Sequence, residues 1–272
     1  MDHHRRHQAF NRSSSATALI HKIMLLLRSV AFNFFLYGFT AVGSIVVMVL
    51  ALILPSRLPG FARWWSHTWL AAYERICGVS YEVRGREYIP DGSCIFAMKH
   101  QSTWDTLALF AVFREPVLVF KRELTWIPFF GWALLRMGCI PVKRGSGKTA
   151  LDSMIRGTTI AFKRNKQLVI FPEGTRSCVG QLSVYKKGVS HLYEALQVAC
   201  VPVAVNSGNL WPRRKFLRPR GIITLEILPP IQPGASRKQM LSMLEEQIET
   251  TSKRLSVGPD ARTAGSGPQP GH

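Results

Sequence analysis

The sequence predicts an α/β fold, in which a mostly parallel sheet flanked by helices follows an N-terminal membrane-associated helical hairpin. Two observations predict it. After Gly78, short β-type runs alternate with longer stretches of helical spacing, which is typical of strands joined through helices. Before that point, residues 30–54 contain no Asp, Glu, Lys, Arg or His, and a tryptophan-rich stretch of helical spacing follows them.

Composition limits the kind of partner this chain can have. Among 272 residues, 35 are Lys or Arg and 16 are Asp or Glu, which gives a formal net charge of +19. Such a charge favours an anionic partner, namely a nucleic acid, an acidic lipid surface or a phosphorylated substrate. The 5 cysteines are scattered without a Cys-x-x-Cys pair, so neither a disulfide framework nor a zinc site is expected, and a reducing, cytosol-facing location fits.

The N-terminal part predicts a basic leader over residues 1–29 and a membrane-associated hairpin over residues 30–78. A helix formed by residues 30–54 would be about 37 Å long, enough for a hydrocarbon core of about 30 Å. A cleaved signal peptide is the alternative. The apolar run is longer than the roughly 7–15 residues of a signal core, and no Ala-x-Ala site follows it, so we expect the segment to be retained.

The direction of insertion favours a hairpin over a single crossing. The cations of the leader should keep it cytoplasmic, and one full crossing would then place the rest of the chain outside. Pro55 and Pro59 end the first helix, and Trp64, Trp65 and Trp69 follow in a stretch typical of the headgroup level. A re-entrant or interfacial hairpin therefore keeps the rest of the chain in the cytosol.

Residues 79–255 are expected to form the α/β domain. The predicted strands are residues 81–85, 94–98, 117–120, 139–142, 168–171, 201–205 and 223–228. The predicted helices are residues 103–113, 124–137, 148–164, 189–196 and 236–255. Pro202 falls early in one strand and indicates an edge strand or a bulge. Residues 256–272 are rich in Gly, Pro and Ser and are predicted to be a disordered tail.

The first candidate site is "AMKHQSTWDTLAL", where His100 and Asp105 follow a predicted strand. A His/Asp pair is the base half of a nucleophilic triad, but no nucleophile stands beside it. At this separation the two side chains cannot meet within one helix, but they can if the helix begins between them at Ser102 or Thr103. The alternative is a capping box from Ser102 to Asp105 in which His100 takes no part.

The second candidate is "GCIPVKRGSGKTAL", which places Lys143 and Arg144 after a predicted strand. These cations could hold a phosphate, or they could be a solvated surface pair. The stretch resembles a nucleotide-binding loop at first sight. That interpretation fails because Val142 stands where such a loop needs a glycine.

The third candidate is "LVIFPEGTRS", where a buried-strand pattern runs directly into Glu173, Gly174 and Arg176. Gly174 permits close backbone approach or an unusual φ angle, Arg176 can bind a phosphate, and Glu173 can accept a hydrogen bond from a hydroxyl. The alternative is a turn held by its own Glu/Arg pair.

The order of these motifs resembles the glycerolipid acyltransferase family. It consists of His-x-x-x-x-Asp at His100 and Asp105, then "GCIPVKRG", then "FPEGTRS", then "VPVAV". The resemblance covers residues 81–228, and an N-terminal membrane hairpin is also expected for the family. One departure is Lys99, where many members carry Asn before the histidine.

This resemblance implies that the substrate supplies the missing nucleophile. His100 would take the proton from the 2-hydroxyl of lysophosphatidic acid, whose oxygen would attack an acyl thioester, and Asp105 would orient the imidazole. The product would be phosphatidic acid. The other implied roles are phosphate binding by Lys143, Arg144, Arg176 and Lys121, and shaping of the acceptor site by Glu173 and Gly174.

The partners implied by the same resemblance are acyl-CoA or acyl-carrier protein as donor, lysophosphatidic acid as acceptor, and membrane phospholipids. No metal or organic cofactor is required. The protein would lie in the inner membrane of the cell with its catalytic domain facing the cytoplasm.

Other functions remain open at this stage. The enzyme could acylate another lysolipid or glycerol 3-phosphate, or it could be a membrane-bound thioesterase that activates water or a serine such as Ser102. A non-enzymatic alternative is a basic protein that binds the membrane surface. The basic and aromatic stretch "NLWPRRKFLRPRG" suits nucleic acid or lipid headgroups, and the membrane segment favours lipid, so no nucleic acid partner is expected.

Overall fold

The structure is a computed structural model that describes residues 2–127, 130–143, 145–181 and 183–257, with main chain only for residues 2–16. Within these residues the centre of the fold is a seven-stranded sheet of order β1-β7-β6-β2-β5-β3-β4. The strands are β1 Val79–Arg84, β2 Ile95–Met98, β3 Pro116–Lys121, β4 Ile140–Val142, β5 Gln167–Ile170, β6 Cys200–Val205 and β7 Gly221–Ile227. Neighbours pair in parallel, except for the antiparallel pair β6 and β7. The predicted mostly parallel sheet is therefore confirmed.

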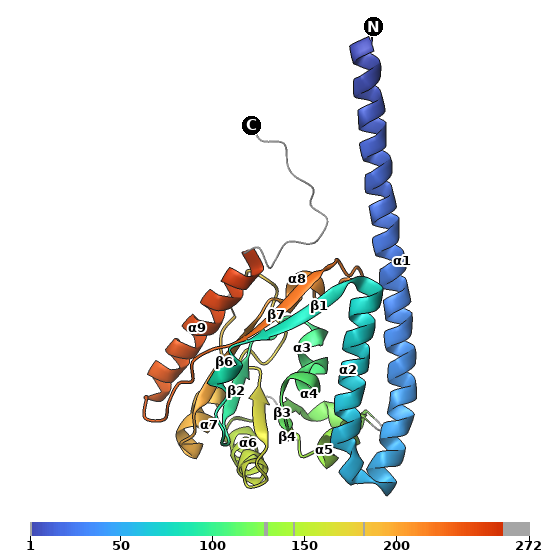
Figure 1. Cartoon of the computed structure of the whole chain (residues 1–272). Coiled ribbons are helices and arrows are strands. Elements are labelled where there is room, and N and C mark those ends of the chain that lie inside the picture. The colour runs from blue at the N-terminus through green and yellow to red at the C-terminus, as the bar shows by residue number, and fades with distance from the viewer. Residues whose placement is uncertain (1, 128–129, 144, 182, 258–272) are drawn as a thin grey trace.

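Helices flank this sheet (Figure 1). Those of the described chain are α1 Asp2–Ile53, α2 Leu58–Cys77, α3 Thr103–Leu107, α4 Leu109–Val112, α5 Phe130–Arg136, α6 Gly147–Phe162, α7 Gly188–Leu196, α8 Ser207–Leu210 and α9 Arg237–Val257. Two predicted helices differ from the structure. The predicted helix 103–113 is interrupted at Ala108, between α3 and α4, and the predicted helix 124–137 begins as a 3-10 turn before α5.

The four residues of β2 face two different hydrophobic cores. Phe96 and Met98 belong to the core that includes side chains of α1 to α5. Ile95 and Ala97 belong to the core that includes side chains of α6, α7 and α9. All four side chains are fully buried, because a central parallel strand has helices on both of its faces.

Helices α1 and α2 run antiparallel and side by side, joined by the 3-10 turn Pro55–Arg57 (Figure 1). The predicted leader and the predicted apolar segment form one continuous helix, whose N-terminal part extends beyond the rest of the fold (Figure 1). Its segment Thr17–Ile53 is long and apolar enough to cross a membrane, and many of its large apolar side chains are exposed. This surface is consistent with membrane association.

The inner face of α1 packs in an aromatic cluster. The Phe32 ring centroid lies 4.5 Å from that of Tyr73 and 5.5 Å from that of Trp211. Trp69 is fully buried in the same cluster, so the prediction that it lies at headgroup level is wrong. Trp64, in contrast, is 54% exposed.

Pro202 lies in β6, which is an internal strand, so the prediction of an edge strand there is wrong. The β6 strand pairs with β2 on one side and with β7 on the other. The alternative of a bulge agrees with the pairing: the Pro202 carbonyl accepts from the Leu228 N–H at 2.9 Å, and the next bridge joins Cys200 to Ile231, so the segment after β7 has one extra residue beside Pro202.

Candidate active site

The predicted site residues with described positions lie at one edge of the sheet. His100 follows β2, Glu173 follows β5, Lys121 ends β3 and Lys143 follows β4. These four strands are parallel neighbours in the order β2-β5-β3-β4, so their carboxyl ends meet at the same edge. Ligand sites of parallel α/β sheets lie at such an edge.

The His100 and Asp105 side chains meet because the helix begins between them. Ser102 is the N-cap of α3, with extended backbone at φ −142° and ψ 174°, and the chain before it leaves His100 on a loop. The distance from His100 Nδ1 to Asp105 Oδ2 is 3.0 Å. The capping box is also present, because Ser102 Oγ accepts from the Trp104 N–H at 2.9 Å while Asp105 accepts from the Ser102 N–H. The two interpretations of this motif are therefore compatible.

The Asp105 carboxylate is fully buried and holds several donors. In addition to the histidine ring, its Oδ2 accepts from the Gln101 N–H at 2.7 Å and from the Ser102 N–H at 2.8 Å. Its Oδ1 accepts from the hydroxyl of Ser207, at the start of α8. Ser207 was not predicted, although polar residues that follow an apolar strand, here Asn206 and Ser207 after β6, are a usable signal. These hydrogen bonds fix the orientation of the Asp105 carboxylate, which accepts a hydrogen bond from the His100 imidazole.

The His100 ring is held on two sides and remains 14% exposed. It stacks on Phe171 from the "FPEGTRS" segment, with ring centroids 4.1 Å apart and an interplanar angle of 20°. Because Nδ1 donates to Asp105, the neutral ring carries its lone pair on Nε2. That nitrogen can accept a proton from a bound substrate.

The "FPEGTRS" segment also holds the main chain of His100. Glu173 Oε1 accepts from the His100 N–H at 3.1 Å, and the Ser177 N–H donates to the His100 carbonyl at 2.8 Å. The Glu173 side chain is 1% exposed and therefore faces the interior. Gly174 has a φ of 69°, a left-handed conformation that favours glycine and completes the turn after β5. In the structure Glu173 thus supports the histidine loop.

Arg176 lies beside the start of α3. Its Nη1 donates to Thr103 Oγ1 at 2.8 Å, and its carbonyl accepts from Arg213 Nη1 at 3.1 Å. The guanidinium is therefore close to the dyad, because Thr103 directly follows the N-cap of the helix that carries Asp105.

Thr103 also lines a large apolar cavity of about 340 Å³. The walls come from α1, α2, α3, α4, β3, the 3-10 turn after β3 and α5, with side chains that include Leu36, Trp65, Phe110, Phe120 and Leu134. A cavity of this size and character suits part of an apolar ligand. The sequence did not reveal it, because its lining residues are spread over several elements between Leu36 and Met137.

Of the remaining predicted cations, Lys121 and Lys143 have described positions, and neither makes a hydrogen bond or ion pair with the dyad there. Lys121 pairs with Glu123 at 3.7 Å, and its side chain is 46% exposed. Lys143 is also exposed, and it lies near Lys121 because Lys121 is in register with Val142. Arg144 lies outside the described residues. The described chain contains no group of three or more His, Cys, Asp or Glu side chains placed to hold a metal ion.

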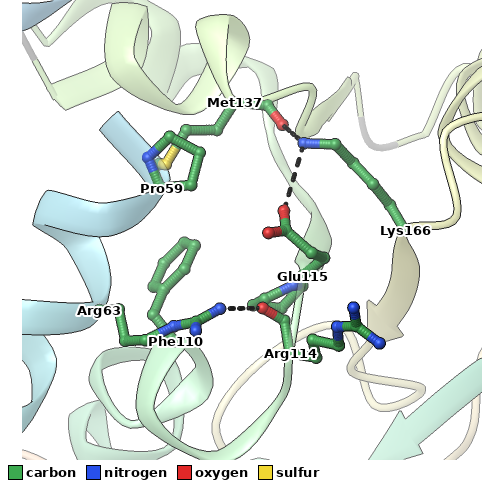
Figure 2. A pocket seen from close by; sticks show the side chains of 8 residues that line it. Pro59, Arg63, Phe110, Arg114, Glu115, Met137 and Lys166 are labelled. Carbon is green, nitrogen blue, oxygen red and sulfur yellow. Dashed lines mark hydrogen bonds and ion pairs between the residues drawn. The ribbon is translucent and has the colours of Figure 1, made fainter. Parts of the chain in front are cut away.

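A second, much smaller cavity of about 10 Å³ lies where β3 and β5 begin, at the opposite edge of the sheet (Figure 2). Its polar groups bind one another (Figure 2). Arg63 donates to the Arg114 carbonyl at 2.5 Å, while Lys166 donates to the Met137 carbonyl at 2.9 Å and pairs with Glu115 at 3.9 Å. The space corresponds to about one water molecule, so it is not a substrate site.

Fold and site together define the class of protein: an α/β enzyme with a His/Asp pair at the carboxyl edge of its sheet, its aspartate buried and its histidine partly exposed, beside an apolar cavity. A family model described as Acyltransferase matches residues 80–206. The chain is 32% identical over 225 residues to a 1-acyl-sn-glycerol-3-phosphate acyltransferase of Pseudomonas aeruginosa, covering 82% of this chain and 88% of that protein. The chain belongs to the acyltransferase family.

Two further similarities extend this finding. A 1-acyl-sn-glycerol-3-phosphate acyltransferase of Saccharomyces cerevisiae is 28% identical over 236 residues, which cover 85% of this chain and 77% of that protein. The crystal structure of a 1-acyl-sn-glycerophosphate (LPA) acyltransferase, PlsC, from Thermotoga maritima matches with a TM-score of 0.68 at 23% identity. That match covers 87% of this chain and 98% of the other, and it shows that the two proteins share a fold.

Proposed function

We propose that this enzyme transfers a fatty acyl group from acyl-CoA or acyl-carrier protein to the 2-hydroxyl of 1-acyl-sn-glycerol 3-phosphate, giving phosphatidic acid. The curated relatives of Pseudomonas aeruginosa and yeast are named for acyl transfer to this acceptor. The reaction belongs to phospholipid biosynthesis. Both acceptor and product are anionic membrane lipids, which suits a net charge of +19 and an exposed apolar helix.

In the proposed reaction His100 is the general base and the acceptor is the nucleophile. Nε2 of His100 takes the proton of the 2-hydroxyl as its oxygen forms a bond to the thioester carbonyl carbon. The tetrahedral intermediate collapses by breaking the carbon–sulfur bond, and the imidazolium returns the proton to the departing thiolate. Asp105 holds Nδ1 and stabilises the imidazolium that forms in between.

The observation that carries this proposal is the position of Thr103. It lines the apolar cavity, binds Arg176 and belongs to the same short helix as Asp105. An acyl chain in the cavity and a phosphate at Arg176 would therefore both approach the His100 ring. Each buried methylene group contributes about 0.8 kcal/mol, which is sufficient to hold an acyl chain in place.

The acceptor phosphate is assigned first to Arg176, because a guanidinium can bind phosphate through two parallel hydrogen bonds. Lys143, Arg144 and Lys121 are proposed as further cations for the same phosphate, on the grounds of their sequence motifs. Glu173 and Gly174 shape the acceptor site indirectly, through the turn that positions Arg176 and the loop of His100.

A thioesterase that uses Ser102 as nucleophile is less well supported. The Ser102 side chain is fully buried and its oxygen caps α3 by accepting from the Trp104 N–H. A capping hydroxyl inside the protein cannot reach a thioester without unravelling the helix start.

The proposal is tested by acyl transfer from labelled acyl-CoA and labelled acyl-carrier protein to lysophosphatidic acid, glycerol 3-phosphate and a phosphate-free lysolipid. We expect labelled phosphatidic acid as the main product. Arg176→Ala should lower kcat/KM for lysophosphatidic acid by roughly 10- to 100-fold, because a charge-assisted contact to phosphate is lost. Lys215→Ala, which removes an exposed cation two residues after Arg213, the residue that contacts the Arg176 carbonyl, is the matched control and should behave as the parent. Release of free fatty acid without an acceptor would contradict the proposal.

We further propose that the protein is held in the inner membrane with its catalytic domain facing the cytoplasm, where both donors are made. Cysteine labelling tests this orientation. All five cysteines lie in described residues and Cys178 alone is exposed. Burial raises the pKa of Cys94 to about 12 and that of Cys139 to about 11, which keeps those thiols protonated and unreactive at neutral pH.

A membrane-impermeant maleimide should therefore label Cys178 in inverted membrane vesicles and leave it unlabelled in intact spheroplasts. Cys178→Ser should abolish the labelling in both preparations. Labelling of Cys178 from the outside of spheroplasts would contradict the proposed orientation.

A further inference from the structure

Lys99, the residue directly before His100, is buried in an ion-pair cluster. Its side chain is 2% exposed. Its Nζ lies 2.6 Å from Glu249 Oε1 on α9 and 3.3 Å from Glu173 Oε1 in the "FPEGTRS" segment. One ammonium group therefore links the C-terminal helix to the carboxylate that binds the His100 N–H.

A tyrosine completes this cluster. The Tyr185 hydroxyl donates to Glu249 Oε1 at 3.0 Å. Burial raises the pKa of Tyr185, and the charges of Glu249 and Glu173 raise it further, so the hydroxyl stays protonated and continues to donate. The two carboxylates thus share one ammonium group, and Glu249 also accepts from one neutral donor.

The cluster leaves Glu173 dependent on Lys99. Glu173 Oε2 is buried without a hydrogen-bond partner in the described structure, so all of the contacts of this carboxylate run through Oε1. An unpaired carboxylate in the interior is strongly unfavourable. Without Lys99, the buried Glu173 carboxylate loses its counter-ion, and a displacement that restores its solvation weakens its bond to the His100 N–H.

We infer that Lys99 is a positioning residue for the proposed acyl transfer: its ammonium group holds the Glu173 carboxylate in place, so that Glu173 fixes the main chain of His100. This inference rests on the proposed function in one respect: the kinetic test assays acyl transfer. The contacts from Lys99 to Glu173 and from Glu173 to His100 do not depend on which acceptor the enzyme uses.

The competing explanation is that Lys99 only attaches α9 to the domain. Three single variants distinguish the positioning role of Lys99 from a role in attaching α9 alone. Lys99→Met removes the cation that Glu173 needs. Glu249→Gln keeps the pair of Lys99 with Glu173 while weakening the link to α9. Arg254→Met breaks a different ion pair of α9, the one with Glu226 at 2.6 Å, and is the matched control.

We expect Lys99→Met to lower kcat by about tenfold or more, because a small displacement of a catalytic group has a large effect on rate, while KM changes little. Glu249→Gln and Arg254→Met should keep kcat close to that of the parent, even where Tm falls. Lys99→Arg, which keeps the charge, should retain more activity than Lys99→Met. Turnover is followed as thiol release from acyl-CoA, with whichever acceptor the parent uses.

Hydrogen exchange measured by mass spectrometry gives a readout that needs no activity. Exchange in a peptide covering residues 99–105 should be faster in Lys99→Met and unchanged in Arg254→Met. Parent-like kcat and parent-like exchange in Lys99→Met would overturn the inference, as would equal loss of kcat in Arg254→Met. If Lys99→Met does not fold, Lys99→Met/Glu249→Gln replaces it and should show the same losses relative to Glu249→Gln. A parent without transfer activity would contradict the proposed function, while the exchange experiment would still decide the role of Lys99.

Discussion

Replacing His100 by alanine is expected to lower acyl transfer by at least ~10²-fold, because the substitution removes the base that takes the proton of the acceptor hydroxyl. The loss should appear in kcat, since neither the apolar cavity nor Arg176 depends on the imidazole for its own contacts. The measurement is the initial rate of labelled phosphatidic acid formation at saturating donor and acceptor.

The control for this prediction is His191→Ala. His191 lies on α7, and its Nδ1 lies 2.8 Å from Arg237 Nη1 at an exposed position. Its replacement should leave the rate at the parent value. A His100→Ala enzyme as active as the parent would mean that the dyad is not the base, and Asp105 would then act only as a helix cap.

Asp105→Asn is expected to lower the rate between about 10²- and 10⁴-fold with little change in fold. An asparagine oxygen in place of Oδ2 can still accept from the His100 ring and from the Gln101 and Ser102 N–H groups. Its amide can donate to the Ser207 hydroxyl, so the hydrogen-bond pattern is largely kept. The change is the loss of the negative charge that stabilises the imidazolium. The rate and Tm should be measured on the same preparation.

Ser102→Ala is the matched control, because it removes the other half of the capping box. Loss of an N-cap side chain costs about 1 kcal/mol of stability, so Tm should fall while the rate stays near that of the parent. Equal loss of rate in Ser102→Ala and Asp105→Asn would show that the helix start is the decisive feature, or that Ser102 itself reacts.

Most elements of the fold could be predicted because their signals are local. Buried parallel strands appear as short apolar runs, and the seven predicted runs correspond to β1 to β7. The helix interruption at Ala108 was not predictable, since α3 and α4 share one continuous apolar pattern. The edge-strand prediction at Pro202 failed because a proline shows only that one N–H is missing. Whether that N–H is needed depends on the pairing of β6 with β7, which the sequence does not show.

The dyad was predictable for the same local reason. His100 and Asp105 are brought together by a helix start that Ser102 specifies within a few residues. The partners that hold them come from elsewhere. Phe171, Glu173 and Ser207 reach the dyad because β5 and β6 are the neighbours of β2.

The sequence by itself therefore determined the α/β class, the apolar N-terminal helix and the candidate catalytic pair, because each depends on residue spacing within one segment. Only the tertiary structure decided the apolar cavity, the buried cluster of Lys99 with Glu173 and Glu249, and the packing of Trp69. These depend on the order of strands in the sheet and on which helix covers which face. Both are set by the sum of many weak contacts between segments distant along the chain, which no single stretch of sequence contains.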